Sequence, residues 1–339
     1  MRRPSPSMID VARTAGVSLG TVSNVLNNPA KVAETTRRRV EAAIGELGFV
    51  RNGAARSLSS GTSSTFGFVV IDLSNSFFLD MARGAEQEAS GSGMNVLLAN
   101  ADLDDAKQHT YLDLFEEERV AGVLLAPQQN AAGETTSLRA RGMPLVVLND
   151  PSVGPEVWTV QTDNVHGGHL AARHLIELGR RRLVFAGPDD LAVVRQRFEG
   201  VERAVRESGG AVTLERIQTP GVRVEDGRRV GDELLARPAH DRPDGVVAGA
   251  DLLALGLIQS LVVDGRLRVP EDVAVVGYDN NRAAWNSVIP ITTLDQAGEE
   301  MGRRATQMLL AQLDGSPADG RRSVTLEPFL IPRESTVGR

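Results

Sequence analysis

The residue types best suited to recognition chemistry lie in one short segment near the N-terminus. It reads Ile9-Asp10-Val11-Ala12-x-x-Ala15-Gly16-Val17-Ser18-x-x-Thr21-Val22-Ser23, a spacing that fits two short helices joined by a turn at Gly16. The second helix would expose small hydroxyl and amide groups, which suit contacts with phosphates and with base edges in a DNA major groove. We expect these contacts to come from Ser18, Leu19, Gly20, Thr21, Ser23, Asn24 and Asn27. An ordinary three-helix bundle with a polar surface is the alternative, and the ordered spacing of the motif argues against it.

The rest of the chain offers little for catalysis or metal binding. It contains no cysteine, so disulfides, thiolate metal sites and cysteine nucleophiles are excluded. His166, His169 and His174 are close together, but their spacing places them on one helix without a carboxylate at ligand spacing. No phosphate-binding loop, serine elbow or Gly-x-Gly-x-x-Gly motif follows a predicted strand. We therefore expect no catalytic residue, no metal site and no cofactor.

Three short helices are expected to position the N-terminal motif. The first covers residues 8–15, and the second begins at Ser18. The second helix ends before Pro29, because proline disfavours a helical conformation in the residue that precedes it. The third helix follows Glu34, with Thr35 as its cap.

From residue 66 onward, short apolar runs alternate with amphipathic helical segments. Strands that are apolar along nearly their whole length and are separated by helices indicate a parallel sheet covered on both faces. About eleven strands exceed what one sheet comfortably holds, so we predict two α/β lobes that divide near Asp163. The clearest runs lie at 67–71, 95–98, 122–125, 145–148, 183–185, 245–247 and 273–276. The helical segments lie near 77–91, 105–118, 165–179, 195–209, 225–237, 252–264 and 297–313.

A polar segment separates the predicted helices from the apolar runs. Residues 53–58, after Asn52, could form about two helical turns, which is too short a helix to be stable in isolation. The Ser/Gly/Thr-rich stretch 59–65 is typical of a flexible linker. We expect a conditional helix that forms only against a partner.

Charge is unevenly distributed along the chain. Residues 1–60 contain nine Lys or Arg and four Asp or Glu, whereas the remaining 279 residues contain 28 basic and 40 acidic side chains. A basic head on an acidic body suggests a polyanion-binding module. No apolar run approaches the roughly 20 residues that a membrane helix needs, and the N-terminus lacks the apolar stretch of a secretory signal. We expect a cytoplasmic protein without membrane contact.

The segment from Met8 to Leu58 closely resembles the LacI/GalR (lactose-repressor) family of bacterial transcription regulators. The resemblance extends over essentially the whole chain through Asp72-Leu73-Ser74-Asn75-Ser76-Phe77-Phe78, Asp163-Asn164, Gly277-Tyr278-Asp279 and Pro290-Ile291-Thr292-Thr293-Leu294-x-Gln296. It implies an all-α helix-turn-helix head followed by a periplasmic-binding-protein-like α/β core, with a ligand between two parallel-sheet lobes.

For the head, the resemblance implies that a symmetric homodimer binds a palindromic double-stranded DNA operator through the major groove. Leu19 and Gly20 hold the two positions that usually discriminate bases. Asn24 stands where many relatives carry arginine, so an adenine or a phosphate is expected as its partner rather than a guanine. The conditional helix 52–59 matches the hinge helix of the family, which would contact the minor groove through Asn52, Ala55 and Leu58.

For the core, the resemblance places the ligand at the carboxyl ends of the strands. Arg197 could donate to hydroxyls or a carboxylate, Asp279 could accept from two vicinal hydroxyls, and the phenylalanines could cover a ring. The expected effector-binding residues are Phe77, Phe78, Asn149, Arg197, Asp251, Asp279 and Gln296. Core packing of the phenylalanines and a purely structural role for Arg197 and Asp279 are the alternatives.

Two departures from the family pattern affect the expected ligand. Ala250 stands where relatives commonly carry asparagine, and Asn149 stands where they often carry aspartate. The usual hexose network is therefore incomplete, and the effector is smaller or differently substituted, or the site has drifted. No leucine heptads follow Arg333, so we expect a dimer rather than a tetramer.

We therefore predict a repressor, not an enzyme, whose operator affinity is controlled by a sugar or sugar-like ligand. The alternatives are a solute-binding protein, or a regulator with a non-sugar or lost effector. Whether the ligand releases or recruits DNA is left open. The predicted domains are a DNA-binding head at 1–51, a hinge and linker at 52–64, and a core at 65–339 whose lobes comprise 65–163 with 293–322 and 164–292 with 323–339.

Replacing Leu58 tests the expected hinge helix. If Leu58 wedges into the central base step, Leu58→Ala leaves the core folded but weakens specific DNA binding, because the wedge stabilises a bent duplex. Gel-shift titration and a DNA-bending assay measure the two effects. Unchanged affinity together with an unchanged bend contradicts the prediction.

Overall fold

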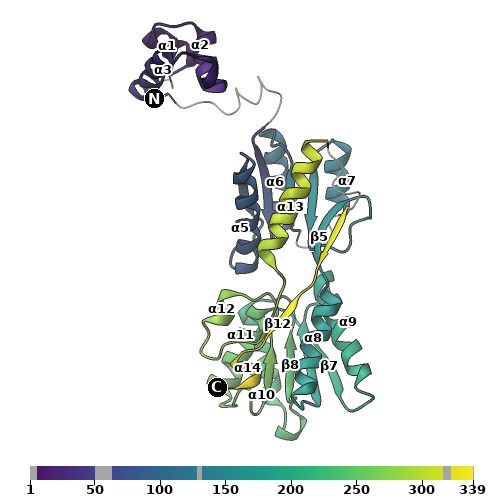
Figure 1. The fold of residues 1–339 in the computed structure, drawn as a ribbon. Helices are drawn as coiled ribbons and strands as arrows, with labels where there is room; N and C mark the ends of the chain where they lie inside the picture. Colours follow the sequence, from purple (N-terminus) through teal and green to yellow (C-terminus); the bar gives the residue numbers. More distant parts are fainter. Residues whose placement is uncertain (1–5, 50–62, 128–131, 316–321, 339) are drawn as a thin grey trace. The chain divides into compact units, whose positions relative to one another are not determined.

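The computed structural model describes residues 6–49, 63–127, 132–315 and 322–338. The chain divides into two compact units, Met1–Ser63 and Ser64–Arg339 (Figure 1). The expected hinge helix, with Asn52, Ala55 and Leu58, lies outside the described residues. Within the described ranges, no helix is both long and apolar enough to span a membrane.

The N-terminal unit consists of short helices around a small apolar core. They are α1 Met8–Ala15, α2 Leu19–Asn27, the 3-10 helix η1 Pro29–Lys31 and α3 Glu34–Leu47. Gly16 joins α1 to α2 in a left-handed conformation with φ 63°, as the motif predicts. Val11, Val22 and Val40, one from each α-helix, are fully buried in the core. The predicted cap of the third helix is wrong, because α3 begins one residue before Thr35.

The first lobe of the larger unit is built on a six-stranded parallel sheet in the order β11-β5-β4-β3-β1-β2. Its strands are β1 Thr65–Val70, β2 Asn95–Asn100, β3 Val123–Leu125, β4 Leu145–Leu148, β5 Trp158–Thr162 and β11 Ser323–Leu326. Its helices are α5 Ser76–Gly91, α6 Asp105–Glu117, α7 Ala132–Ala140 and α13 Gly298–Leu313. Phe66 and Phe68 belong to the core beneath α5 and α13, whereas Phe115 of α6 belongs to a second core. Both faces of the sheet are therefore covered, as parallel sheets require.

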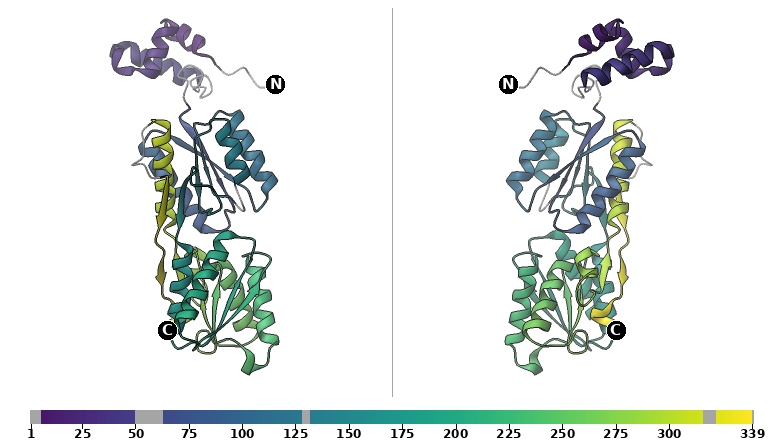
Figure 2. Two further views of the ribbon diagram at one scale, coloured as in Figure 1. Left: turned by 90° about the vertical axis from the view of Figure 1, so that its right-hand side faces the viewer. Right: turned by 90° about the vertical axis from the view of Figure 1, so that its left-hand side faces the viewer.

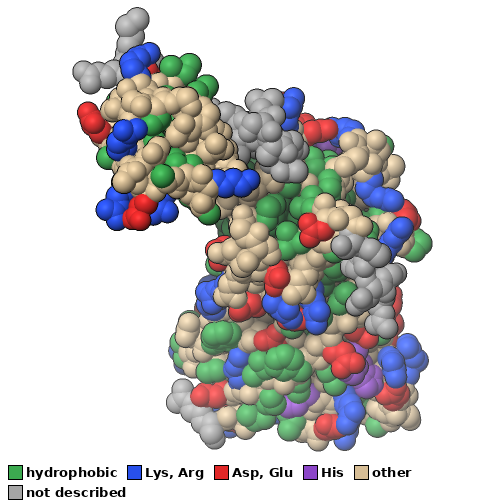
Figure 3. All heavy atoms as spheres, turned by 45° about the horizontal axis from the view of Figure 1, so that its top comes forward, with side chains coloured by type: hydrophobic (Ala, Val, Ile, Leu, Met, Phe, Trp, Pro, Cys, Tyr) green, Lys and Arg blue, Asp and Glu red, His purple; other side chains and the backbone are tan. Residues whose placement is uncertain are grey.

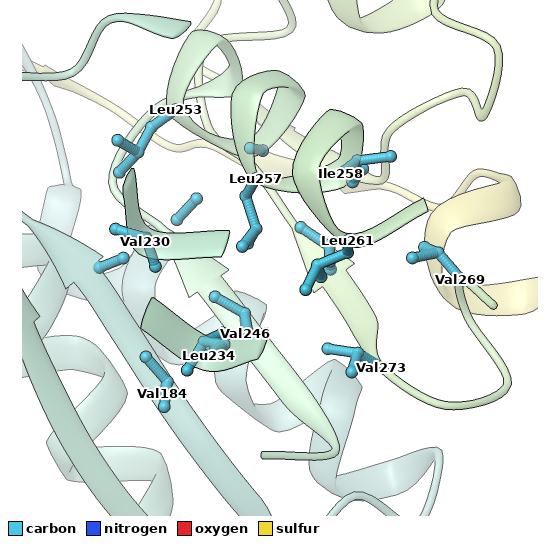
Figure 4. Packing of buried hydrophobic residues seen from close by; sticks show 14 of the residues in the cluster. Val184, Val230, Leu234, Val246, Leu253, Leu257, Ile258, Leu261, Val269 and Val273 are labelled. Atoms are coloured by element: carbon cyan, nitrogen blue, oxygen red, sulfur yellow. The ribbon is translucent and has the colours of Figure 1, made fainter. Parts of the chain in front are cut away.

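The second lobe is built on a four-stranded parallel sheet in the order β7-β6-β8-β9, with helices on both of its faces (Figure 2). Its strands are β6 Arg182–Gly187, β7 Thr213–Gln218, β8 Gly245–Ala248 and β9 Ala274–Val276. Its longer helices are α8 Asn164–Glu177, α9 Ala192–Glu207, α10 Val224–Ala236 and α11 Asp251–Gln259, and α12 Arg282–Trp285 and α14 Glu334–Val337 are short. Figure 4 shows one core of this lobe, where Leu253 and Leu257 lie in one cluster with Val184 and Val246 of the sheet.

The chain passes between the lobes after β5, after β10 (Thr293–Asp295) and between β11 and β12 (Phe329–Ile331). β10 and β12 pair in antiparallel fashion and so tie two of these crossings together. The expected lobe boundary at residue 323 differs from the structure, because β11 pairs with β5 in the first lobe. The partly exposed, alternating side chains of this edge strand carry no signal of the sheet to which it belongs.

Several elements have no counterpart among the clearest predicted runs and helical segments, namely β5, β7, β10, β11, β12, α7, α12 and α14. β7 is an edge strand with Thr213, Glu215 and Gln218 exposed, so it lacks a continuous apolar run. α7 buries only Thr135 and Leu138, which is too weak a pattern to reveal a helix.

Glycines allow three pairs of helices to approach until their backbones touch. In the first lobe, a Cβ added at Gly84 of α5 would lie 1.9 Å from the carbonyl oxygen of Glu299, and one at Gly302 of α13 would lie 1.9 Å from that of Met81. In the second lobe, the corresponding glycines are Gly168 and Gly200 between α8 and α9, and Gly227 and Gly256 between α10 and α11. A larger side chain at these positions must push the helices apart.

Gly84→Ala should lower the melting temperature of the larger unit. The added methyl cannot fit without moving α13, and overpacking of this kind costs about 1–3 kcal/mol. Gly91→Ala in the same helix is the matched control, because a Cβ there meets no atom within 4 Å and alanine favours the helix. Calorimetry compares the two variants, and equal melting temperatures would contradict the proposed backbone contact.

Candidate functional site

The exposed face of α2 carries the predicted base-contacting positions. Leu19 is 47% exposed, and Gly20 and Asn24 also face solvent. On the opposite face, Val22 and Val25 are buried in the core of the N-terminal unit. The core therefore holds α2 with these three residues directed outward.

Four further predicted contact residues of this region are hydrogen-bonded to one another in pairs. The Ser18 Oγ caps α2 by accepting from the backbone N–H of Thr21 at 3.1 Å. The Asn27 Nδ2 donates to the Ser23 Oγ at 3.2 Å. Figure 3 shows Lys and Arg side chains at several places on the surface of this unit, which suits an approach to phosphates.

A cleft of about 250 Å³ lies between the two lobes of the larger unit. Its lining comes from segments that follow the carboxyl ends of parallel strands, the usual ligand position in open α/β sheets. Six of the seven predicted effector-binding residues line it, namely Phe77, Phe78, Asn149, Arg197, Asp279 and Gln296. The sequence-predicted residues thus come together at one place, with one exception.

Arg197 lies at the floor of the cleft and is almost fully buried. Its guanidinium stacks on the Tyr278 ring at 3.7 Å and lies 3.5 Å from the Asp279 carboxylate. Its N–H groups donate to Asn164 Oδ1 at 3.0 Å, the Gly249 carbonyl at 2.6 Å and Gln296 Oε1 at 3.2 Å. A buried cation needs this combination of an opposite charge and satisfied donors.

The Asp279 carboxylate is held by groups from both lobes. Its Oδ2 accepts from the Asn75 Nδ2 at 2.9 Å, and its Oδ1 accepts from the Gln296 Nε2 at 2.7 Å. Asn75 caps α5 in the first lobe, and Gln296 lies on the crossing after β10. Burial raises the pKa of Asp279, while the Arg197 charge and the two amide donors oppose that rise. The cleft floor is therefore a polar connection between the lobes.

Asp251 is the exception, because it does not line the cleft. It is 1% exposed, and its Oδ1 and Oδ2 accept from the Thr293 hydroxyl at 2.7 Å and the Asn281 backbone N–H at 2.6 Å. Its own N–H donates to the Tyr278 carbonyl, which turns the side chain toward the segment after β9. Burial and the nearby charge of Asp279 raise the pKa of Asp251 well above its ordinary value. Asp251 positions the segment that carries Asp279.

The remaining predicted lining residues differ in how far they face the cleft. Phe78 is partly exposed, whereas Phe77 is buried in the first-lobe core with its ring 5.4 Å from that of Phe78. Asn149 adopts a left-handed conformation with φ 54°, which asparagine tolerates better than most residues. Its amide makes long contacts of 3.4 Å with Gln296 and Asn164.

The histidines of α8 do not converge. His169 contacts Glu207 at 2.7 Å, and His174 contacts Thr336 at 2.8 Å. Throughout the ranges that the structure describes, no group of three His, Asp or Glu residues is placed to hold a metal ion.

Sequence reasoning did not single out Asn75 or the apolar residues 191–194, which also line the cleft. Asn75 precedes a helix and carries a capping signal, but its partner Asp279 lies 204 positions away. Residues 191–194 form the start of α9, and an apolar helix start is ordinarily interpreted as core packing.

Comparison with known proteins adds to this geometry. Residues 7–52 match bacterial regulatory proteins of the lacI family, and residues 172–336 match a periplasmic binding protein-like domain. The chain is 34% identical over 333 residues to the HTH-type transcriptional regulator RegA of Clostridium saccharobutylicum, covering 98% of this chain and 99% of RegA. It is 31% identical over 331 residues to the ribose operon repressor of Escherichia coli (strain K12), covering 97% and 99%. The complex of the transcriptional regulator CelR with cellobiose is 31% identical, with a TM-score of 0.71 over 97% of this chain and 99% of CelR.

Asp251→Asn should change how stability depends on pH. Below the ordinary pKa of 3.8 the carboxyl is protonated in both the folded and unfolded states, so it contributes no pH dependence there. Because the folded state raises the pKa of Asp251, ionisation at higher pH favours unfolding, and stability falls as pH rises through the interval above 3.8. The asparagine can still accept from the Asn281 N–H and donate to the Thr293 hydroxyl.

The free energy of unfolding of Asp251→Asn, relative to that of the unsubstituted chain, should therefore rise with pH and then level off. Urea denaturation at a series of pH values measures it, with Asp314→Asn at an exposed position as the control. A stability difference that stays constant from acid to neutral pH would count against the buried, raised-pKa carboxyl.

Proposed function

The chain belongs to the lacI family of bacterial regulatory proteins and is a DNA-binding repressor with a ligand-binding core, and from this premise we propose that a sugar or sugar-like ligand in the cleft controls its affinity for a palindromic operator. The observation that carries the proposal is the polar floor of the cleft, where Asp279 of one lobe binds Asn75 of the other at 2.9 Å. A ligand that competes for this carboxylate necessarily alters the contact between the lobes.

A second set of contacts between the lobes supports the proposal that a ligand in the cleft alters how the lobes meet. Arg282 of α12 forms an ion pair with Asp80 of α5, and its backbone N–H donates to the Ser76 Oγ at 2.9 Å. Asn281 also donates to Asn75 at 2.9 Å. Because Asn281 and Arg282 come shortly after Asp279 in the sequence, a shift of the Asp279 carboxylate also moves these contacts between the lobes. Small shifts at such an interface are converted into lobe rotations, since packed interfaces have discrete arrangements.

For DNA, we propose that two copies of the chain each place α2 in the major groove of a half-site. The contacts would come from Ser18, Leu19, Gly20, Thr21, Ser23, Asn24 and Asn27, with Asn52, Ala55 and Leu58 in the minor groove. The exposed position of Asn24 and the apolar side chain of Leu19 support direct base contact, because an amide can pair with adenine and an apolar group can contact a thymine methyl.

For the ligand, we propose that Phe78, Asn149, Arg197, Asp279 and Gln296 make the contacts, with Phe77 behind Phe78. Sugar binding is supported by the match to the complex of CelR with cellobiose and to a ribose operon repressor. A non-sugar ligand is the second candidate, and it is favoured by the absence of a side-chain hydrogen-bonding group at Ala250, which lines the cleft.

Selection of DNA fragments from a random pool by the full-length protein, followed by gel-shift titration, tests the proposal. Asn24→Ala should weaken binding to the selected sequence by about tenfold, since a good base contact contributes about 1–3 kcal/mol. Gly45→Ala on α3 is the control, because its Cβ would meet no atom within 4 Å.

The same titration is repeated with sugars, polyols and nucleobases. At least one should change the affinity for the selected DNA about fivefold or more, in either direction. Failure to enrich any sequence over bulk competitor, with and without these compounds, would overturn the proposed function.

A further inference from the structure

A second cavity, of about 320 Å³, lies between α6 and α7 of the first lobe. Its lining residues differ from those of the cleft between the lobes. They recur at helical spacing, so one face of each helix forms a wall of the cavity. Gln108 and His109 belong to the wall from α6, and Glu134 and Arg141 belong to the wall from α7. The cavity is therefore a separate candidate site with polar side chains from two helices.

The Gln108 amide has an oxygen atom without a hydrogen-bond donor. Gln108 is 3% exposed, and its Nε2 donates to the Glu134 Oε2 at 2.5 Å. Its Oε1 is buried and has no hydrogen-bond partner in the part of the chain that the structure describes. A buried acceptor without a donor is costly, and native proteins rarely retain one without a reason. Because Gln108 lines the cavity, a molecule bound there is placed to supply the missing donor.

Glu134, the partner of Gln108, is a second acceptor with little access to water. Its side chain is 12% exposed, and its Oε1 lies 3.2 Å from the His109 Nδ1. That nitrogen also lies 2.8 Å from the Asp105 carbonyl oxygen, so one imidazole N–H is shared between two acceptors. A partly buried carboxylate is stabilised by a charged donor, which this arrangement leaves room for.

The lining carries more negative than positive charge. Three carboxylates line the cavity, those of Asp105, Asp113 and Glu134, whereas the guanidinium of Arg141 is already engaged in an ion pair. Acidic residues in the first turn of a helix are favoured by its dipole, which accounts for Asp105 and Glu134. The dipole accounts neither for Asp113, about two turns further along α6, nor for the unpaired oxygen of Gln108.

The pKa of His109 reflects this negative field. A hydrogen bond to the Asp105 carbonyl raises the pKa, and the charge of Glu134 raises it further. A positive charge is therefore favoured at the cavity. Over the ranges that the structure describes, no group of three His, Asp or Glu residues is placed to hold a metal ion, so the lining favours an organic cation.

We propose that the cavity binds the ammonium group of an aliphatic amine. An ammonium group combines one positive charge with three N–H donors, so it can donate to the Gln108 Oε1 and to the Glu134 carboxylate at once. Leu112 and Leu138 also line the cavity and suit the methylene chain of such a ligand. The same group occurs on a free amine such as putrescine and on the lysine side chain of a partner protein.

Isothermal titration with the full-length protein, in the absence of DNA and at constant ionic strength, tests this inference. The probes are putrescine, butylamine, butanediol, magnesium chloride and a blocked Ala-Lys-Ala peptide. Both free amines should bind, whereas butanediol, which lacks the charge, and magnesium, which lacks a suitable set of ligands, should not. Tighter binding of the peptide than of butylamine assigns the site to a lysine of a partner, and the reverse order assigns it to a free amine.

Variants locate the bound amine. Glu134→Gln should weaken putrescine binding about tenfold, because it removes a charged acceptor in a partly buried position. Glu117→Gln is the matched control, since Glu117 is exposed on α6 and lies outside the lining, and it should change the affinity by less than about twofold. Gln108→Leu should also weaken binding severalfold, because it removes the unpaired acceptor. Circular dichroism verifies the fold of each variant, and Gln108→Leu still tests the site if Glu134→Gln does not fold.

Equal losses of affinity in Glu134→Gln and Glu117→Gln would show that amines associate with the acidic surface through net charge alone, and would overturn the inference. Binding of butanediol or magnesium as tight as that of putrescine would do the same, as would the absence of measurable binding for both amines and the peptide. The test needs neither DNA nor a ligand in the cleft, so its failure leaves the proposed function standing.

Discussion

A guanidinium removed from water must be neutralised and hydrogen-bonded, and this requirement at Arg197 determines how the two lobes meet. The opposite charge comes from Asp279, whose remaining hydrogen-bonding capacity is met by Asn75 of the first lobe and by Gln296 on a crossing. Satisfying one buried charge therefore joins three segments that are far apart in the sequence. The same residues line the cleft, so the network connects the cleft to the contact between the lobes.

Close helix packing fixes the position of that charge. A Cβ at Gly168 of α8 would lie 1.8 Å from the Arg197 carbonyl oxygen, and one at Gly167 would lie 2.0 Å from the Tyr278 hydroxyl. The two adjacent glycines thus set the position of the Arg197 backbone and of the ring on which its guanidinium stacks. Glycine here serves close approach rather than an unusual backbone conformation, because both residues lie within a helix. Rigid packing behind a binding site keeps its polar groups oriented.

Sequence reasoning succeeded where a residue's role depends on its near neighbours. The turn at Gly16, the cap at Ser18 and the strand at 67–71 follow from local sterics, short-range hydrogen bonds and periodicity. It failed where the role depends on distant packing. Asp251 follows a strand like the true lining residues, but its side chain turns to Thr293, and the edge strand β11 joins the first lobe through pairing with β5.

The order of residues alone established the family, the helical head, the alternation of strands and helices, and six residues of the cleft lining out of the seven predicted. Only the tertiary structure decided which polar groups share hydrogen bonds, that Arg197 is already neutralised, and that apolar residues such as Leu191 and Val193 also line the cleft. The physical reason is range: caps and periodicity are encoded within a few residues, whereas burial and charge pairing depend on the distances between atoms of segments brought together by folding.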